Sequence, residues 1–142
     1  MGGGCVIAAS YEAKAFGVKT GMQLREAKKL CPQGIAVPSD FDEAVVASRE
    51  IETILQDRCP IMERMSVDEW YLDMQSLVDD KNVNLLAWAN ETQQTVLRKT
   101  KLSVSVGIAP TKLLSKMASE YRKPAGITLI PEQKSVDEFL KD

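Results

Sequence analysis

Two consecutive acidic residues, Asp68 and Glu69, are the strongest candidates for chemistry in this 142-residue sequence. They lie in the stretch 61–74, whose apolar and aromatic residues with interleaved charges predict strand. Carboxylates are costly to bury there unless a cation or donors neutralise them, and Mg²⁺ typically binds through one or two carboxylates plus substrate phosphates. Neighbouring side chains of a regular strand point to opposite faces, so we expect the strand to turn or end at this pair. A solvated surface bend would produce the same pattern without function.

A cationic helix face is the second candidate. Lys112, Lys116 and Lys123 fall within about 40° of one another at 100° per residue, opposite an apolar side formed by Leu114, Met117, Ala118 and Tyr121. Such a face could hold phosphates as point charges, although a solvated lysine face has the same spacing. Tyr11 and Lys14 place a ring and a second cation one turn apart in an earlier helix.

The composition narrows the class of protein. With 44% hydrophobic and 27% charged residues the chain has an ordinary globular composition, which excludes a disordered chain, a coiled coil and a disulfide scaffold. No apolar run approaches the ~20 residues that cross a bilayer, so we expect no membrane partner. Three widely spaced cysteines indicate reduced thiols in a cytoplasmic protein. The absence of histidine excludes Ser-His and Cys-His catalysis and histidine-ligated zinc. Glycine-rich nucleotide loops are also missing.

The charges are unevenly distributed along the chain. Residues 40–93 carry four basic and thirteen acidic groups, whereas residues 94–123 carry seven basic groups and one acidic group. A cationic stretch beside an acidic one suits a site that meets polyanions and holds a cation, although ordinary solvated surface could also be divided in this way. The net charge of -2 implies weak binding of nucleic acid by this chain alone.

The elements that must position these residues alternate between helix and strand. Residues 11–31 predict two short helices broken at Gly17, with Gly21 also in the turn. Further helices are expected from Asp40 to before Pro60, at 84–98 and after Pro110, and strands within 61–74, 102–108 and 127–130. The order predicts an α+β fold, a sheet covered on one face by helices, with a small helical subdomain at the front.

Three segments, taken together, resemble a known family. Residues 9–22 (ASYEAKAFGVKTGM), 66–73 (SVDEWYLD) and 105–124 (SVGIAPTKLLSKMASEYRKP) are similar in order and spacing to Y-family translesion DNA polymerases of the DNA polymerase IV and V type. The resemblance runs from Val6 to Ile130. It implies a fingers subdomain in residues 1–40, a palm with a ferredoxin-like sheet in residues 41–124, and the start of a thumb or a linker in residues 125–142.

The resemblance also implies a reaction and its partners. Asp68 and Glu69 match the second and third metal-binding carboxylates of the family, at the turn of a palm hairpin. The implied chemistry is two-metal phosphoryl transfer with Mg²⁺, in which a primer 3′-hydroxyl is extended during DNA damage bypass and repair. The implied partners are primer–template DNA and deoxynucleoside triphosphates, together with a sliding clamp or repair proteins for the full-length protein.

Other residues of this sequence also match functional residues of the family. Tyr11 matches the fingers tyrosine that touches the incoming triphosphate, and Lys14 stands where an arginine is common, which keeps the charge but loses the bidentate fork. Lys123 matches the palm lysine that reaches the triphosphate, and Lys116 lies on the same face and is expected to assist it. Trp70 stands where a smaller residue is more usual.

One part of the family pattern has no counterpart in the sequence. The family opens with a palm strand that bears its first metal-binding aspartate, followed by aromatic residues, whereas Met1 is followed by glycines and the fingers pattern. We therefore expect an incomplete two-metal site, little or no polymerase activity from this chain alone, and self-association through an exposed sheet edge. The alternatives are a non-catalytic, polymerase-derived binding module in a DNA repair complex, another palm-like enzyme, or a structural α+β domain.

Overall fold

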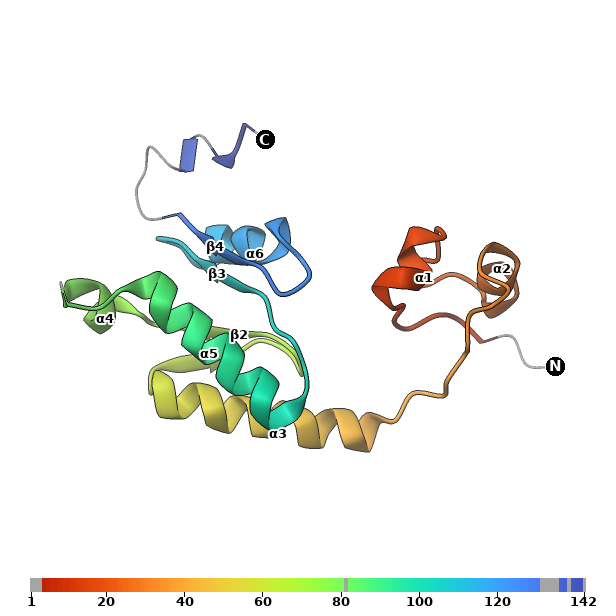
Figure 1. The fold of residues 1–142 in the computed structure, drawn as a ribbon, viewed down its shortest axis with the longest axis horizontal. Helices are drawn as coiled ribbons and strands as arrows, with labels where there is room; N and C mark the ends of the chain where they lie inside the picture. Colours follow the sequence, from red (N-terminus) through yellow and green to blue (C-terminus); the bar gives the residue numbers. More distant parts are fainter. Residues whose placement is uncertain (1–3, 81, 131–135, 138, 142) are drawn as a thin grey trace. The chain divides into compact units, whose positions relative to one another are not determined.

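The computed structural model describes residues 4–80, 82–130, 136–137 and 139–141. The chain divides into two compact units, Met1–Phe41 and Asp42–Asp142, and each is described here by itself (Figure 1). In the described part of the chain, no helix combines the length and the apolar character needed to cross a membrane.

The first unit holds two short helices, α1 (Tyr11–Ala15) and α2 (Leu24–Leu30). Ser10 caps α1, because its hydroxyl oxygen accepts a hydrogen bond from the Ala13 N–H at 3.2 Å. Gly17 and Gly21 have φ angles of 86° and 84°, a region that favours glycine, so the connection between the helices turns where the sequence predicts. The small core consists of Val18, Ala27 and Cys31, surrounded by Val6, Ala9, Ala13 and Met22. Residues 35–38 have no regular secondary structure.

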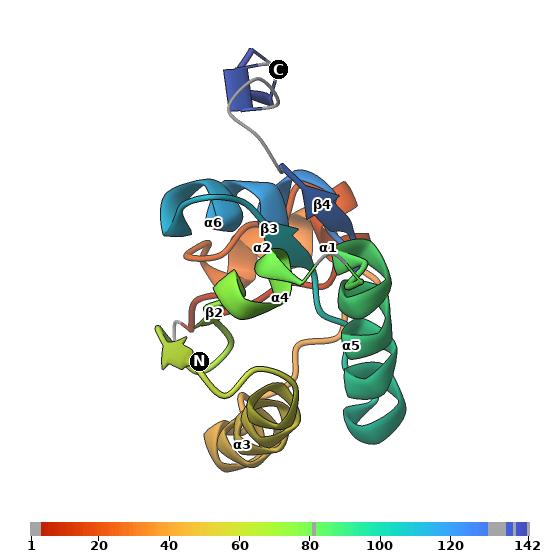
Figure 2. The ribbon, with the colours of Figure 1, turned by 90° about the vertical axis from the view of Figure 1, so that its left-hand side faces the viewer.

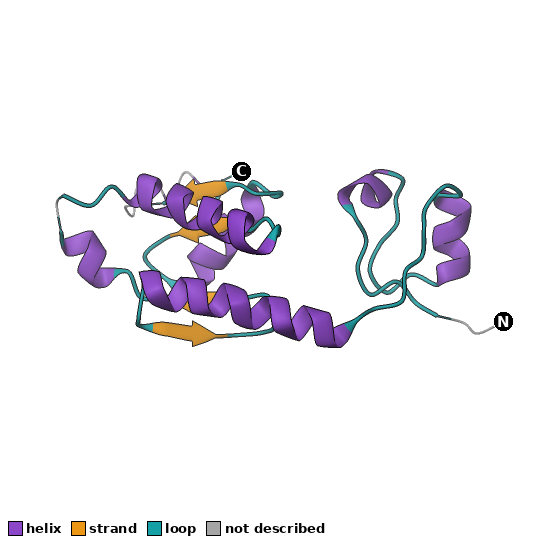
Figure 3. Ribbon diagram, turned by 60° about the horizontal axis from the view of Figure 1, so that its bottom comes forward, coloured by secondary structure: helices purple, strands orange, loops and turns teal. Residues whose placement is uncertain are grey.

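The second unit contains the remaining elements, which are α3 (Phe41–Arg58, its first residue at the boundary), β1 (Met62–Arg64), β2 (Trp70–Leu72), α4 (Gln75–Asp79), α5 (Leu85–Thr100), β3 (Val106–Ile108), α6 (Lys112–Tyr121) and β4 (Ile127–Leu129). The mixture of helices and small sheets confirms the α+β class. The strands, however, form two sheets of two strands each, with β1 antiparallel to β2 and β3 parallel to β4 (Figure 3). The single sheet expected from the sequence is therefore divided in the described residues. Helix α4 was not predicted.

The hydrogen-bonding pattern shows which strand edges lie at the division. Asp73 N–H donates to Ile61 O and Met65 N–H donates to Glu69 O, and hydrogen-bonded pairs alternate along an antiparallel ladder. The backbone groups of Trp70 and Leu72 therefore face the outer edge of β2. On β3 the residues on either side of Gly107 bond to the β4 segment, so the backbone of Gly107 faces outward as well. Within the described residues, no pairing joins these two outer edges.

One face of the β1–β2 hairpin packs against α3 and α5. The buried cluster there consists of Ile51, Ile54, Leu55 and Val96, with Met62, Trp70, Leu72 and Val104 packed against it. Arg58 ties the two helices together, because its Nε donates to Thr92 Oγ1 at 2.6 Å and its guanidinium pairs with Glu91 at 3.2 Å. The predicted cover of helices on one face thus holds for this hairpin.

The β3–α6–β4 segment depends on a glycine. A Cβ atom at Gly107 would lie 2.1 Å from the backbone oxygen of Ser115 and 2.4 Å from the backbone nitrogen of Ser119, so β3 can approach α6 only without a side chain here. Ala118, Ile130 and Val136 form a buried cluster beside this contact. Figure 2 shows α6 alongside β3 and β4. Since β4 pairs with β3, residues 127–129 belong to the second unit, and their assignment to the start of a thumb stays a prediction.

Candidate functional site

The two predicted acids lie at the turn of the β1–β2 hairpin. Asp68 is within the turn, and Glu69 is the residue immediately before β2. The N–H groups of Met65 and Ser66 both donate to the carbonyl oxygen of Glu69, at 3.0 and 3.3 Å, and close the loop. The chain therefore turns at this pair, as the placement of two adjacent carboxylates in one site requires.

Hydrogen bonds within the turn and from α3 hold the turn in place. Ser66 Oγ donates to Asp68 Oδ1 at 2.7 Å and accepts a hydrogen bond from the Asp68 N–H at 3.3 Å. The buried hydroxyl of Ser48 in α3 donates to the carbonyl oxygen of Val67 at 2.5 Å and accepts from Arg64 Nη2 at 2.9 Å. The position of Asp68 thus depends on the side chain of Ser66 within the turn and on Ser48 in a helix distant in the sequence.

The hairpin has a second, polar face, which α6 approaches. Because side chains alternate along a strand, Glu63 and Tyr71 point away from the face that packs on α3 and α5. Lys112 forms an ion pair with Glu63, and its ammonium lies 5.6 Å from the centre of the Tyr71 ring. One turn later on the same helix, Lys116 forms an ion pair with Glu69. Helix α6 therefore meets this side of the hairpin through two lysines, opposite the side that α3 and α5 cover.

The three predicted lysines all have carboxylate partners. Lys116 also pairs with Glu120 at 3.2 Å, and Lys123, which follows the end of α6, lies 3.8 Å from the same carboxylate. The hydrogen bond and the charge of Lys116, and then the charge of Lys123, hold the pKa of Glu120 below its ordinary value. The lysine face is thus interleaved with glutamates in the described structure.

Tyr11 and Lys14 contact each other in α1. The ammonium of Lys14 lies 4.9 Å from the centre of the Tyr11 ring, and the tyrosine is 49% exposed. Both residues belong to the first unit and the acids belong to the second. A meeting of this pair with the acids across a nucleotide stays a prediction.

Trp70, the bulky residue beside the acids, belongs to the core. Its side chain packs against the cluster formed by α3 and α5, and its indole Nε1 is buried without a hydrogen-bond partner. The Trp70 side chain therefore lies between the hairpin and the helices α3 and α5, rather than in the site.

Sequence reasoning missed several residues that shape the site. The position of Glu63 and Tyr71 on the polar face of the hairpin could have been predicted, because they alternate with the apolar residues of their strands. Glu120 could have been found by its helical spacing from Lys116. Ser48 carried no such signal, since its hydrogen bond to the turn depends on tertiary packing.

The acids do not form a complete metal cage by themselves. Among the described residues, no group of three or more His, Cys, Asp or Glu side chains is placed to hold a metal ion. Asp68 and Glu69 therefore offer two carboxylates, a set that suits a hard cation also bound by other oxygen ligands.

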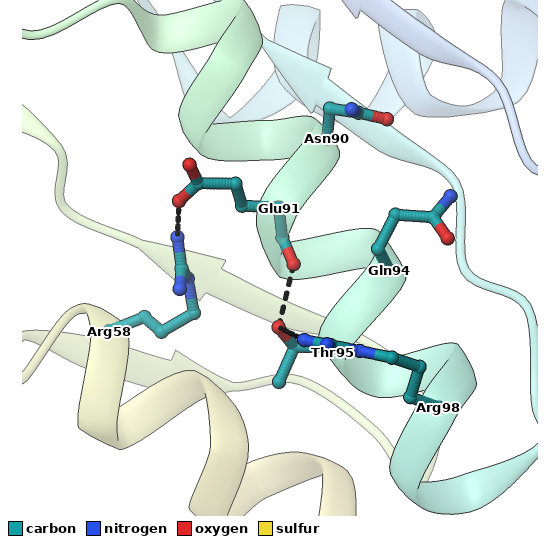
Figure 4. Close-up of a pocket in the computed structure, with 6 residues that line it drawn as sticks. All are labelled: Arg58, Asn90, Glu91, Gln94, Thr95 and Arg98. Carbon is teal, nitrogen blue, oxygen red and sulfur yellow. Dashed lines mark hydrogen bonds and ion pairs between the residues drawn. The ribbon is translucent and has the colours of Figure 1, made fainter.

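A shallow hollow lies elsewhere on the second unit. It has a volume of about 430 Å³ and lies beside α5 and the end of α3, where its lining residues are Arg58, Asn90, Glu91, Gln94, Thr95 and Arg98 (Figure 4). It contains none of the site residues predicted from the sequence. Arg58 and Arg98 are both hydrogen-bonded to neighbouring side chains there.

Comparisons with known proteins agree with the motifs. Residues 1–120 match the model of the impB/mucB/samB family. DNA polymerase IV 1 from Halalkalibacterium halodurans is 41% identical over 127 residues, which cover 89% of this chain and 30% of that protein. DNA polymerase IV 1 from Bacillus subtilis is 40% identical over 134 residues, which cover 94% of this chain and 32% of that protein.

Solved structures give the same result. The insertion ternary complex of Dbh DNA polymerase has a TM-score of 0.90 and 35% identity, over 97% of this chain and 40% of that one. A Y-family DNA polymerase chimera has a TM-score of 0.89 and 35% identity over the same shares. This chain spans about a third of the length of the curated relatives it matches. The resemblance in the three sequence segments is thereby confirmed, and the chain belongs to the impB/mucB/samB family.

Proposed function

We propose that this chain forms part of the catalytic core of a translesion DNA polymerase, which adds deoxynucleotides to a primer opposite a damaged template. The observation that carries the proposal is the position of Asp68 and Glu69 at a tight hairpin turn, next to the lysines of α6. The similarity to DNA polymerases IV supports it. The same similarity does not favour the alternative of a non-catalytic binding module.

The acid pair fits a divalent cation of the Mg²⁺ type. Its ligands are hard carboxylate oxygens, the type that Mg²⁺ prefers. Glu69 is paired with the ammonium of Lys116, which a metal ion would displace from the carboxylate. When bound, Mg²⁺ would activate the attacking hydroxyl and neutralise charge on the phosphates. Ser66 would hold Asp68 in its orientation by the hydrogen bond that it donates to Oδ1.

The nucleotide would be bound by the cationic residues predicted from the sequence. Lys123 and Lys116 would bind phosphate oxygens as point charges. Tyr11 and Lys14 would contact the triphosphate from the first unit. Because lysine lacks the fork of arginine, Lys14 would restrain the triphosphate less strictly in orientation.

A metal-binding experiment tests the site. Mn²⁺ affinity of the purified chain is measured by electron paramagnetic resonance in the presence of a deoxynucleoside triphosphate and primer–template DNA. We expect the double change Asp68→Asn and Glu69→Gln to abolish the protein-dependent part of the bound signal, which is the difference from a sample with nucleotide and DNA but without protein. The matched control is Asp79→Asn with Asp80→Asn, another adjacent pair, whose carboxylates accept hydrogen bonds from Gln75 and Asn82. An unchanged signal in the acid-pair variant would contradict the proposal.

An activity experiment tests the role in a polymerase. In a chimera, this chain replaces the matching 134 residues of DNA polymerase IV 1 from Bacillus subtilis. We expect the chimera to extend a primer with Mg²⁺, and Asp68→Ala to reduce the rate by at least about a thousandfold. The 142-residue chain alone is expected to extend it slowly or not at all. Normal extension by the isolated chain would overturn that expectation.

We also propose a cytoplasmic location and self-association. Cys5, Cys31 and Cys59 are free thiols, a state that a reducing compartment would preserve. The outward-facing backbone groups of Trp70, Leu72 and Gly107 support self-association by strand pairing. A constant monomeric mass in size-exclusion chromatography with light scattering, across micromolar concentrations, would contradict it.

A further inference from the structure

We infer that Lys116 is a positioning residue that holds Glu69 through its ammonium until a divalent ion takes the carboxylate. Glu120 then retains the lysine. The inference rests on the proposed function, since it concerns the same acid pair. It assigns to Lys116 a role that precedes any contact with a nucleotide.

The contacts of Lys116 place it between two carboxylates. It pairs with Glu69 at the hairpin turn and with Glu120 one turn later on its own helix, at 3.2 Å. Its side chain is 35% exposed, compared with 61% for Lys112 and 45% for Lys123. Lys116 is thus the least exposed of the three lysines and the one in contact with a member of the acid pair.

The ammonium is suited to exchange for a metal ion. Ion pairs between partly exposed side chains are weak. Competition from the lysine would therefore lower the affinity of the acid pair for a divalent ion by only roughly two- to fivefold. When Glu69 is released, the contact with Glu120 keeps the ammonium beside the site. The donors freed from Glu69 can then bind phosphate oxygens, because an ammonium has three N–H groups. Metal and triphosphate should therefore bind with positive coupling.

Lys112 provides a natural control on the same helix. It lies one turn earlier and is likewise paired with a glutamate of the hairpin, but its partners are Glu63 and the Tyr71 ring. A substitution there removes the same charge from the same helix without touching the acid pair. Differences between the two variants therefore report the contact with Glu69 rather than the loss of a surface lysine.

The test is Mn²⁺ titration of the full chain, followed by electron paramagnetic resonance, without and with a deoxynucleoside triphosphate. Without nucleotide, Lys116→Met should raise the Mn²⁺ affinity about two- to fivefold, and Lys112→Met should leave it unchanged. Glu120→Gln should lower the affinity, because Lys116 then has Glu69 as its remaining carboxylate partner among the contacts described. Lys116→Arg should restore the wild-type value. With the triphosphate, the wild type should gain affinity and Lys116→Met should gain less.

The possible failures are distinguishable. If the wild type binds Mn²⁺ through the acid pair but Lys116→Met has unchanged affinity, the role of Lys116 is wrong and the proposed function stands. If Asp68→Asn with Glu69→Gln leaves Mn²⁺ binding unchanged, both are wrong. Since Lys116→Met and Glu120→Gln should shift the affinity in opposite directions, a general loss of folding cannot produce the expected pattern. Shifts in the same direction would also overturn the inference.

Discussion

The hydroxyl of Ser48 donates a hydrogen bond to the carbonyl oxygen of Val67, so a buried residue in the middle of α3 holds the loop that carries the acid pair. The same hydroxyl accepts from the guanidinium of Arg64, which also pairs with Glu52 at 3.1 Å. The acidic turn is therefore attached to the helix layer beneath it by a polar network. A substitution of Ser48 should therefore affect both stability and the site.

Ser48→Ala tests this attachment. Removing the hydroxyl leaves the Val67 carbonyl and one Arg64 donor without this partner, so we expect a loss of about 1–3 kcal/mol in the free energy of unfolding. We also expect weaker Mn²⁺ binding, because Asp68 follows Val67 directly. Urea unfolding and the Mn²⁺ titration measure the two effects.

Thr53→Ala is the matched control for that experiment. It removes a hydroxyl from the same helix, where Oγ1 donates to the Arg49 carbonyl at an exposed position. Its effect should stay within about 0.5 kcal/mol, with unchanged Mn²⁺ affinity. Equal effects of the two substitutions would show that the hydrogen bond to the turn has no special role.

Gly107→Ala should disrupt the contact between β3 and α6. The new methyl group would meet backbone atoms of Ser115 and Ser119, which cannot move aside as a flexible side chain can. We expect a loss of about 1–3 kcal/mol in the free energy of unfolding, measured by urea unfolding. Gly4→Ala, where no atom lies within 4 Å of the added Cβ, should change stability by less than about 0.5 kcal/mol. A neutral Gly107→Ala would contradict the close approach of strand and helix.

Cys59 should be the slowest of the cysteines to react. It is 4% exposed and its thiol donates to the Asp73 carbonyl at 3.1 Å. Burial, followed by the negative charge of Asp73, raises the pKa of the Cys59 thiol. A smaller thiolate fraction and poor access should slow alkylation at least about tenfold relative to the exposed Cys5. Peptide mass spectrometry after iodoacetamide treatment at pH 8 measures this, and equal rates would exclude a buried Cys59.

Glu120 should contribute to acid sensitivity. Because Lys116 and Lys123 lower its pKa in the folded chain, its contribution to stability is present above the ordinary carboxyl pKa. That contribution is lost as the pH falls through the lowered folded value. The stability difference between the wild type and Glu120→Gln should therefore be greatest near neutral pH and shrink on acidification. Unfolding curves recorded from pH 7 to pH 3 measure it, and a constant difference would contradict the assignment.

Local features of the sequence were sufficient to predict the turn at the acid pair and the lysine face of α6. The alternating apolar stretch contains two adjacent acids, and side-chain alternation requires a turn there if both are to serve one site. Helical spacing placed Lys112 and Lys116 on one face, and Gly17 with Gly21 predicted the turn in the first unit. Each of these depends on residues near one another in the sequence.

Pairings between distant residues could not be predicted in this way. Lys112 and Glu63 lie 49 positions apart, and no local pattern specifies which glutamate a lysine will meet. The division into two sheets could not be predicted for the same reason. Period-two alternation identifies which face of a strand is buried, but it does not identify the strand with which it pairs. The strand expected at 102–108 is restricted to Val106–Ile108, where β4 supplies a partner.

Helix α3 begins at Phe41, the last residue of the first unit, and two turns later it presents Ser48 to the acidic loop. Seven residues of helix correspond to a rigid lever of roughly 10 Å. A substitution that breaks the first two turns of this helix would therefore displace the Val67 carbonyl and with it Asp68, although neither residue lies in α3.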